Sequence, residues 1–410
     1  MSQSPPDFYI GAPVDPDDLC FRGEFITEIH DHLRNHHLIL SAPRRTGKTS
    51  VMDYLAAHPH GGFSPISVFV QDISHPADFI LLLLDLFHEK HPKWFKDLFA
   101  KGSGLIGKVL GRVGEIEAQG FKVTLRQQEP DWRENWKKHG DEFFAQVRKS
   151  EHRLLLLVDE FPDMILNMQK HDASLVRPFL AWFRGHRLTP HPKQDHVRWL
   201  LCGSVNLSST LDGIDCLDEI NDLMDVALPP LTKEQVIEFV ETMLTSRKVS
   251  FDPKVPAKVA RELGRPVPVF LQMVTQDLYR MAKKAGKPLA VRDVSRAFAD
   301  LIVTSGARDK LQHYYSRIDM YYPVPKAAAA YALLAKLAIS PAGLSRASLF
   351  AEFEQSLVQQ GDTSPANKRK QVFNQLLRDL ENEFYVAEIK AGHFDFSSGL
   401  LKPWWRKYYA

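Results

Sequence analysis

The sequence has few of the features that mark a secreted or membrane protein. Its 410 residues include only three cysteines, Cys20, Cys202 and Cys216, which form neither a metal-binding spacing nor a disulfide framework. The longest apolar stretch, Phe79–Phe87, is interrupted by Asp85 and is far shorter than the roughly 20 residues that span a bilayer. No basic and apolar leader begins the chain. We therefore expect a cytoplasmic protein that makes no membrane contact.

A strong charge of one sign is also lacking. The formal net charge is +2 and the hydrophobic content is 44%. Such a charge gives no global attraction to nucleic acid, so any such binding would need a local patch. The length and the ordinary apolar content are sufficient for two or three domains with buried cores.

What the sequence does contain is an alternation of short apolar strands and amphipathic helices. This pattern is typical of a parallel, doubly wound α/β sheet. A segment at about 92–130 differs, being basic and punctuated by glycine, and we interpret it as an inserted helix and hairpin. A helix capped by Asp131 is expected to follow it. The predicted strands are His37–Ser41, Pro65–Asp72, Leu154–Val158, Val197–Cys202 and a weaker Val226–Leu228.

The strongest motif follows the first predicted strand. It matches the phosphate-binding pattern G-x-x-x-x-G-K-[ST] except that Ala42 replaces the first glycine, so that position need not be left-handed. Backbone amides of such a loop form a nest for phosphate, and Gly47 allows close approach. Lys48 is expected to reach the β- and γ-phosphates of ATP, and the Thr49 hydroxyl to bind Mg²⁺. The predicted nucleotide-binding residues are Ala42, Pro43, Arg44, Arg45, Thr46, Gly47, Lys48, Thr49 and Ser50.

A second motif, at Leu154–Glu160, is an apolar strand that ends in two carboxylates. Alone it could equally be a core strand with solvated acids at its end. Together with the phosphate loop it predicts Asp159 in the Mg²⁺ shell and Glu160 as the group that orients or deprotonates the attacking water. The next strand ends at Cys202-Gly203-Ser204, which the parallel sheet would place near the phosphates. Ser204 is therefore a candidate contact to the γ-phosphate or to water, with a capping serine as the alternative.

Arginines near this region could supply a cation to the transferred phosphate. Arg184, Arg187 and Arg198 are candidates, although an ordinary surface role is the more common one for arginine. Arg44 and Arg45 could touch phosphate, pair with an acid or meet a partner.

The motifs, in this order, resemble those of the prokaryotic STAND-type ATPases of the AAA-plus superclass. The resemblance covers nearly the whole chain and rests on Ser41–Ser50, Val158–Pro162 and Cys202–Ser204. It implies a P-loop NTPase core at 1–230 with the insertion, a helical lid at 231–320, a linker at Tyr321–Pro325 and a winged-helix domain at 325–410. It also implies that Pro266, in Leu263-Gly-Arg-Pro, packs on the base. The alternative for Pro266 is the first position of a helix. The family's entry segment is matched by Phe21–Glu24 with its Arg-Gly order reversed, which leaves the role of Arg22 undefined.

The C-terminal segment is the ambiguous part. Ser364-Pro365 is predicted to start a helix whose first turns hold Lys368, Arg369 and Lys370, and a hairpin is expected to turn at Ala391-Gly392. Residues 325–410 contain eleven basic and eight acidic residues, a net charge of +3, which is a modest footprint for DNA binding. Protein docking is therefore an equally open use of this domain.

Three readings follow. The first is a slow Mg²⁺-dependent ATPase that binds ATP and ADP and switches a protein assembly or its own oligomer. The second is an ATP-dependent DNA-binding factor that acts through the winged helix. The third is a nucleotide-gated scaffold without turnover.

Overall fold

The computed structural model describes residues 7–43, 45–99, 132–188, 196–203, 207–303 and 305–410. The chain forms two compact units. One comprises residues 15–42 and 48–228, and the other comprises residues 1–14, 43–47 and 229–410. Each is described by itself below.

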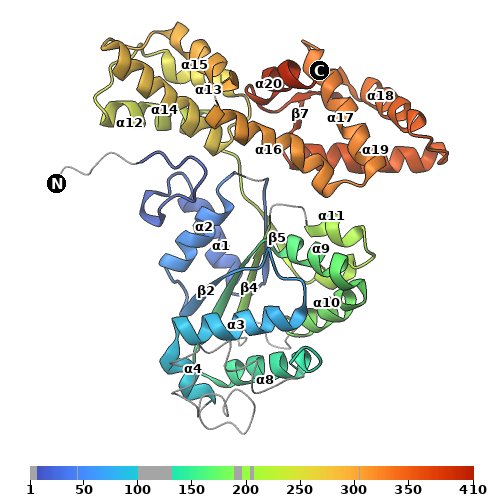
Figure 1. The fold of residues 1–410 in the computed structure, drawn as a ribbon. Coiled ribbons are helices and arrows are strands. Elements are labelled where there is room, and N and C mark those ends of the chain that lie inside the picture. Colours follow the sequence, from blue (N-terminus) through green and yellow to red (C-terminus); the bar gives the residue numbers. More distant parts are fainter. Residues whose placement is uncertain (1–6, 44, 100–131, 189–195, 204–206, 304) are drawn as a thin grey trace. The chain divides into compact units, whose positions relative to one another are not determined.

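The first unit is built on a parallel five-stranded sheet (Figure 1). The spatial order is β2-β3-β4-β1-β5, so β4 lies between the strand that leads into the phosphate loop and the strand that ends in the acid pair. All five predicted strands are confirmed. Their bounds are β1 Leu38–Ser41, β2 Phe63–Phe69, β3 Arg153–Asp159, β4 Val197–Cys202 and β5 Met224–Ala227.

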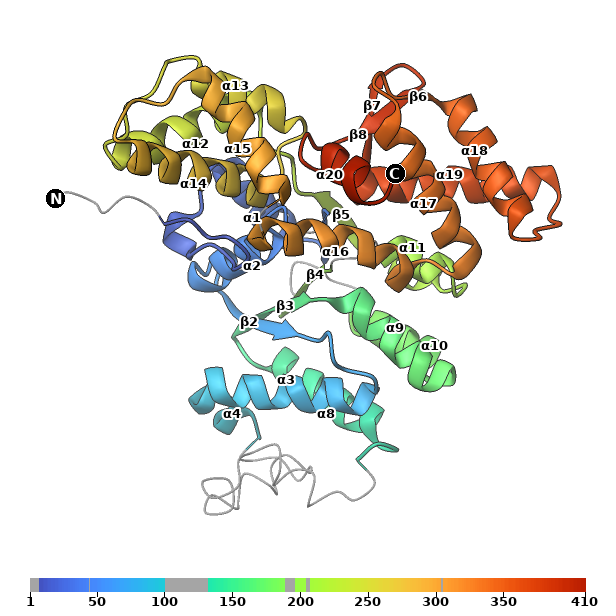
Figure 2. The same ribbon diagram turned by 45° about the horizontal axis from the view of Figure 1, so that its top comes forward.

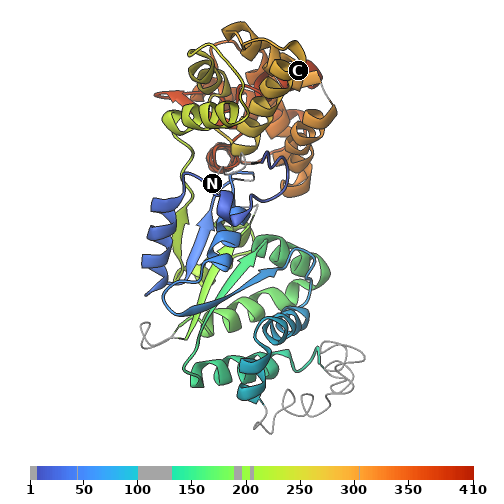
Figure 3. The same ribbon diagram turned by 90° about the vertical axis from the view of Figure 1, so that its left-hand side faces the viewer.

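Helices cover both faces of this sheet, as the side view in Figure 3 shows. One face packs on α1 and α2 through side chains such as Ile29, Val51 and Leu157. The other packs on α3, α8, α9 and α10 through a larger cluster rich in aromatic rings, including Phe79 and Trp199. The helices of this unit are α1 Gly23–Leu33, α2 Lys48–Ala57, α3 Pro76–Lys90, α4 Pro92–Phe99, α8 Trp136–Lys149, α9 Phe161–Asp172, α10 Val176–Gly185 and α11 Leu207–Asp212.

The predicted insertion is described only in part. Its helix is α4, whereas the predicted hairpin near Phe121 lies outside the described residues, as does Asp131. The following helix begins at Trp136 with Asn135 in the capping position, later than predicted. The difference arises because residues 132–135 form turns rather than helix.

The second unit begins with a purely helical layer, as predicted. Thr232 starts it with a reciprocal capping box to Gln235. The N-terminal segment packs here, where the Phe8 ring lies 4.4 Å from the Arg247 guanidinium carbon. The helices are α12 Lys233–Ser246, α13 Val255–Leu263, α14 Pro268–Ala285, α15 Val291–Val303 and α16 Ser305–Tyr321.

The C-terminal part of this unit combines helices with a small antiparallel sheet (Figure 2), the element types expected of the predicted winged helix. Three helices, α17 Val324–Ile339, α18 Arg346–Gln359 and α19 Ala366–Asn382, pack beside a small antiparallel sheet of order β6-β8-β7. The hairpin turns at Ala391-Gly392 as predicted, while α19 begins after Pro365, one residue later than expected. The remaining elements are β6 Leu344–Ser345, β7 Val386–Lys390, β8 His393–Phe396 and α20 Leu401–Tyr408.

The last helix of the layer, α16, packs its aromatic side chains on the C-terminal elements. Tyr385 of the sheet edge donates its hydroxyl hydrogen to Tyr314 O at 2.6 Å. Tyr315 stacks on Tyr409 with ring centroids 3.7 Å apart. The buried Arg317 guanidinium lies 3.0 Å from the Glu383 carboxylate. The expected linker is therefore only the two residues between α16 and α17. Through these contacts α16 shares a core with the C-terminal elements.

A tight seam joins the loop between α13 and α14 to the chain that leaves β8. Arg265 N donates to Ser397 O at 2.8 Å, and Gly399 N donates to Leu263 O at 3.0 Å. The Arg265 guanidinium lies 4.1 Å above the Phe384 ring. This loop also contains Pro266. Proline stands at the first position of α14, but that residue is Pro268, so Pro266 is not the helix-starting proline.

Candidate nucleotide site

The phosphate loop connects β1 to α2 at the carboxyl end of the sheet. Ala42 is not among the residues with positive φ, whereas Gly47 has φ +101° and Arg45 has φ +64°. The left-handed turns therefore come late in the loop, which explains why alanine is tolerated at its first position. Thr46 closes the loop by donating to Pro43 O at 2.7 Å, and its side chain is buried.

The two predicted motifs meet at one hydrogen bond. The Thr49 hydroxyl, at the start of α2, lies 3.0 Å from Asp159 Oδ2 at the end of β3. The side chain of Lys48 is buried, and its Nζ donates to Ala42 O at 2.5 Å. A hydroxyl and a carboxylate this close are the pair that holds Mg²⁺ in P-loop enzymes. The described residues therefore fit a magnesium–nucleotide complex.

Glu160 adopts a backbone conformation that is unusual for a residue with a side chain. Its φ is +62° and it stands immediately before α9. Its amide donates to Asp159 Oδ1 at 2.9 Å. A left-handed glutamate costs about 1 kcal/mol or more, and such strain clusters at functional sites. The kink places two successive carboxylates at the same edge of the sheet.

Two residues at this edge were given no role by the sequence reasoning. Cys202 is buried at the end of β4, in register with Leu40 of β1 and one step beyond the Val158–Leu201 pair. Burial first, and then the neighbouring Asp159, raise the pKa of its thiol well above the usual value. No sequence signal identifies a single cysteine as a neighbour of Asp159, because that proximity depends on β4 lying beside β3 in the sheet.

The second missed residue is Asp53 of α2. It lies one helical turn after Thr49, a spacing that puts both side chains on one face. Burial, and then the charge of Asp159, raise the pKa of the Asp53 carboxyl. The helical spacing from Thr49 was the signal that could have identified it.

The remaining predicted residues are placed as follows. Ser50 is buried on α2. Arg45 donates from Nη1 to Lys310 O at 3.1 Å. Arg44 and Ser204 lie outside the described residues. Arg22 is buried directly before α1, and burial lowers the pKa of its guanidinium.

All three candidate arginines have partners within the unit, and Arg187 and Arg198 are buried. Arg187 is buried and its Nε lies 2.8 Å from Asp222 Oδ2. Arg198 lies inside β4 and donates to the carbonyl oxygen of Leu33 at the end of α1. Arg184 donates to the side chain of Asn221 at 2.9 Å. None of them was recognisable as structural from the sequence, because their partners lie on other elements.

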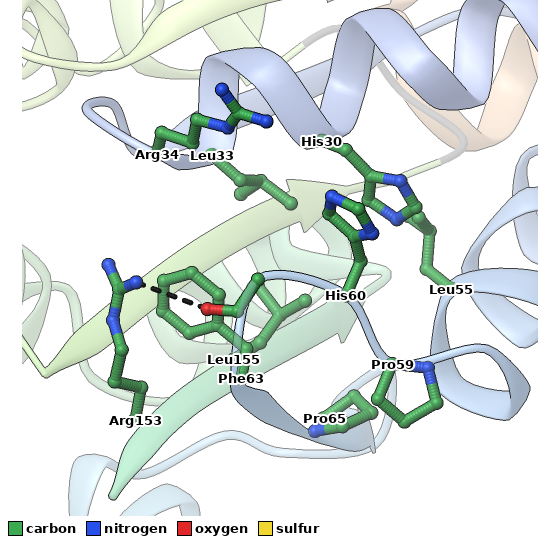
Figure 4. A pocket seen from close by; sticks show the side chains of 11 residues that line it. His30, Leu33, Arg34, Leu55, Pro59, His60, Phe63, Pro65, Arg153 and Leu155 are labelled. Carbon is green, nitrogen blue, oxygen red and sulfur yellow. Dashed lines mark hydrogen bonds between the residues drawn. The ribbon is translucent and has the colours of Figure 1, made fainter. Parts of the chain in front are cut away.

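A separate, small hollow lies at the opposite end of the strands (Figure 4). Its walls include the stacked rings of His30 and His60, with centroids 4.4 Å apart. Arg153, which donates to Gly61 O at 3.2 Å, starts β3, whereas Asp159 ends it. The hollow is therefore distinct from the nucleotide site.

Comparisons with solved structures identify the fold. The Aeropyrum pernix ORC2 protein, solved as ADPNP–ADP complexes, is 12% identical with a TM-score of 0.52, covering 97% of this chain and 94% of that one. The chain has an AAA-plus fold. Drosophila ORC bound to DNA has a TM-score of 0.44 at 13% identity, covering 94% of this chain and 85% of that one. The Thermotoga maritima RuvB Holliday junction branch migration motor has a TM-score of 0.40 at 11% identity, covering 91% of each chain.

Protein-family models and curated protein sequences gave no match. In this AAA-plus fold the loop after β1 and the acids after β3 stand at the carboxyl edge of the sheet, where parallel sheets bind ligands. The narrower resemblance to STAND-type ATPases stays a prediction. Within the described parts of the chain, no helix is long and apolar enough to cross a bilayer.

Proposed function

We propose that this protein is a Mg²⁺-dependent ATPase switch of the STAND type, which binds ATP, hydrolyses it slowly and controls a protein assembly. The observation that carries the proposal is the 3.0 Å contact between Thr49 Oγ1 and Asp159 Oδ2. It joins residues 110 positions apart at the edge where the phosphate loop stands.

Each residue has a distinct task in this proposal. Gly47 and the loop amides bind the phosphates, and Lys48 neutralises them. Thr49 and Asp159 hold the metal ion, and Glu160 orients the attacking water. Pro266 packs on the base. The seam between the Pro266 loop and the chain after β8 supports a switch, because a shift of that loop would move the winged helix with it.

The test is phosphate release by the purified chain with Mg-ATP. Lys48→Ala is expected to abolish ATP binding and turnover, whereas Lys138→Ala, an exposed lysine of the same unit, should change neither. Glu160→Gln should retain ATP but lose turnover by about 100-fold or more, the usual contribution of a general base. Equal phosphate release by wild type and Lys48→Ala would refute ATP hydrolysis at this site. ATP binding with phosphate release no higher than the protein-free background, and unchanged by Glu160→Gln, would favour the non-hydrolysing scaffold.

Binding to DNA through the winged helix is the second candidate function, and the charges of α19 favour it. Of the acids that weakened this reading in the sequence, Asp379 is paired with Lys326 at 2.7 Å and Glu383 with the buried Arg317 at 3.0 Å. These carboxylates are neutralised by their own partners. Lys368 and Lys370 remain exposed, so these two acids do not offset them on α19.

Arg369 differs from its two neighbours. Its Nη2 donates to Asp362 O at 2.6 Å and its Nε lies 3.3 Å from the same residue's carboxylate. It therefore braces the loop before α19. We expect Lys368→Glu and Lys370→Glu to weaken duplex binding strongly and to reduce its salt dependence. Lys407→Glu, an exposed reversal on α20, controls for net charge. Duplex binding that changes neither with salt concentration nor with Lys368→Glu and Lys370→Glu would exclude DNA binding through the winged helix.

A further inference from the structure

Four polar side chains form a line along α19. They stand at intervals of four, three and four residues, which brings them onto one stripe of a helix. The opposite face is apolar and buried in the domain core through Phe373, Leu376 and Leu377. The stripe consists of Asn367, Gln371, Asn374 and Arg378. It contains two central amides, a guanidinium at its far end and no carboxylate.

The central amides differ in how they are held. Asn374 is half-buried, and its Oδ1 accepts a hydrogen bond from Arg346 Nη2 at 2.9 Å. The Arg346 guanidinium also lies 5.8 Å from the Phe373 ring. Gln371 is exposed, and among the described residues no hydrogen bond of its side chain is recorded. One amide is thus oriented in advance and the other is open to a ligand.

The charges around the stripe fit a polyanion. Arg346 flanks its middle, Arg378 ends it with Nη2 3.0 Å from Gln375 Oε1, and Lys368 and Lys370 stand beside its first turn. Two acids lie at the margin. Glu388 accepts a hydrogen bond from Gly392 N in the hairpin turn, and Glu381 is half-buried. Burial, and then Glu388, raise the pKa of the Glu381 carboxyl, so it marks the end of the basic surface.

The residue types specify what this surface would recognise. An amide side chain can accept from N6 and donate to N7 of adenine at the same time, a pairing that only the major groove of DNA presents. An α-helix of about 10–12 Å diameter fits that groove. Gln371 and Asn374 are three residues apart, about 4.5 Å along the axis, which is close to the ~3.4 Å spacing of successive bases.

We propose that α19 reads duplex DNA in the major groove, and that Gln371 and Asn374 select two adjacent A·T base pairs. This inference rests on the DNA-binding candidate above and adds to it a sequence preference. The lysines beside the stripe contact phosphate and supply affinity, whereas the two amides supply the discrimination.

The test is selection of bound duplexes from a random pool by the full chain with Mg-ATP. Adjacent A·T pairs should be enriched, and replacing either pair should weaken binding by about 5- to 100-fold. Gln371→Ala should erase the preference at one position and leave binding to random duplex within about twofold. Because Gln371 is exposed, this variant is expected to fold normally. Lys368→Ala should instead weaken all sequences equally.

The outcomes separate this inference from the function it rests on. Salt-dependent binding without any enriched sequence would overturn the readout and leave DNA binding intact. An enriched sequence of G·C pairs that Gln371→Ala does not alter would also overturn it, because guanidinium groups rather than amides would then read the bases. Absence of binding to any duplex would end both proposals.

Discussion

Replacing Gly399 by alanine tests the seam between the Pro266 loop and the winged helix. A β-carbon added at Gly399 would lie 1.7 Å from the main-chain oxygen of Glu262 and 2.9 Å from its carbonyl carbon. A normal approach of carbon to oxygen is about 3.3 Å. Both partners are backbone, so rotation of a side chain cannot relieve the overlap. The two backbone segments of the seam must therefore separate by roughly 1.6 Å, the difference between 3.3 Å and the 1.7 Å approach to the oxygen.

The cost can be worked out from the contacts that would be broken. Two backbone hydrogen bonds, Arg265 N to Ser397 O and Gly399 N to Leu263 O, cross the seam, and each contributes about 1 kcal/mol. The overpacking adds about 1–3 kcal/mol. We therefore expect Gly399→Ala to destabilise this unit by about 3–5 kcal/mol and to lower its Tm by roughly 10 °C.

The assay is calorimetric unfolding of the full chain, combined with amide hydrogen exchange at residues 262–266 and 397–400. Gly361→Ala is the matched control, because Gly361 has φ +77° but nothing within 4 Å of an added β-carbon. Its cost should be only the strain of about 1 kcal/mol. If the two variants unfold at the same temperature, or if exchange at the seam is unchanged in Gly399→Ala, the close packing inferred here is wrong.

Three further predictions concern charge. Burial lowers the pKa of His37 to about 3, so below about pH 6.5 the unfolded chain binds a proton that the folded chain does not. His37→Gln should therefore reduce the loss of stability on acidification, by up to about 1.4 kcal/mol per pH unit between pH 6.5 and 3. Urea unfolding across this pH range measures the effect. Asp53→Asn should raise the Tm without Mg²⁺, by removing repulsion from Asp159, and should reduce the further stabilisation by Mg-ATP; an unchanged Mg²⁺ response would show that Asp53 does not contribute to the metal site. Glu383→Gln should destabilise by about 3–5 kcal/mol, because the charge of the buried Arg317 loses the carboxylate that lies 3.0 Å away. In thermal unfolding, a loss below about 1 kcal/mol would show that this ion pair is dispensable.

The nucleotide site was predictable because its signals are local. Gly47, Lys48 and Thr49 act through a loop whose conformation their own sequence specifies, and an apolar strand ending in Asp159 identifies its own place in a parallel sheet. The same local reasoning correctly predicted that Ala42 can replace the first glycine of the loop. A position without positive φ imposes no need for glycine.

The charge of the C-terminal surface was not predictable in this way. The sequence placed Asp379 and Glu383 beside the basic residues of α19, but their partners are Lys326 and Arg317, on two other helices. Arg369 counted as part of the basic cluster, yet it binds Asp362. Counting residues weighs every charge equally, whereas ion pairing removes some charges from the surface.

The sequence by itself determined the α/β class, the five strands and the phosphate loop, since periodicity and glycine placement express backbone preferences that neighbouring residues share. Only the tertiary structure decided that the charge of Asp159 reaches Cys202 and Asp53 and that Arg187 and Arg198 are buried. It also decided that the loop of Pro266 is hydrogen-bonded to the chain after β8. Those facts depend on strand order and on contacts between residues far apart in the chain, and no local pattern of residues encodes them.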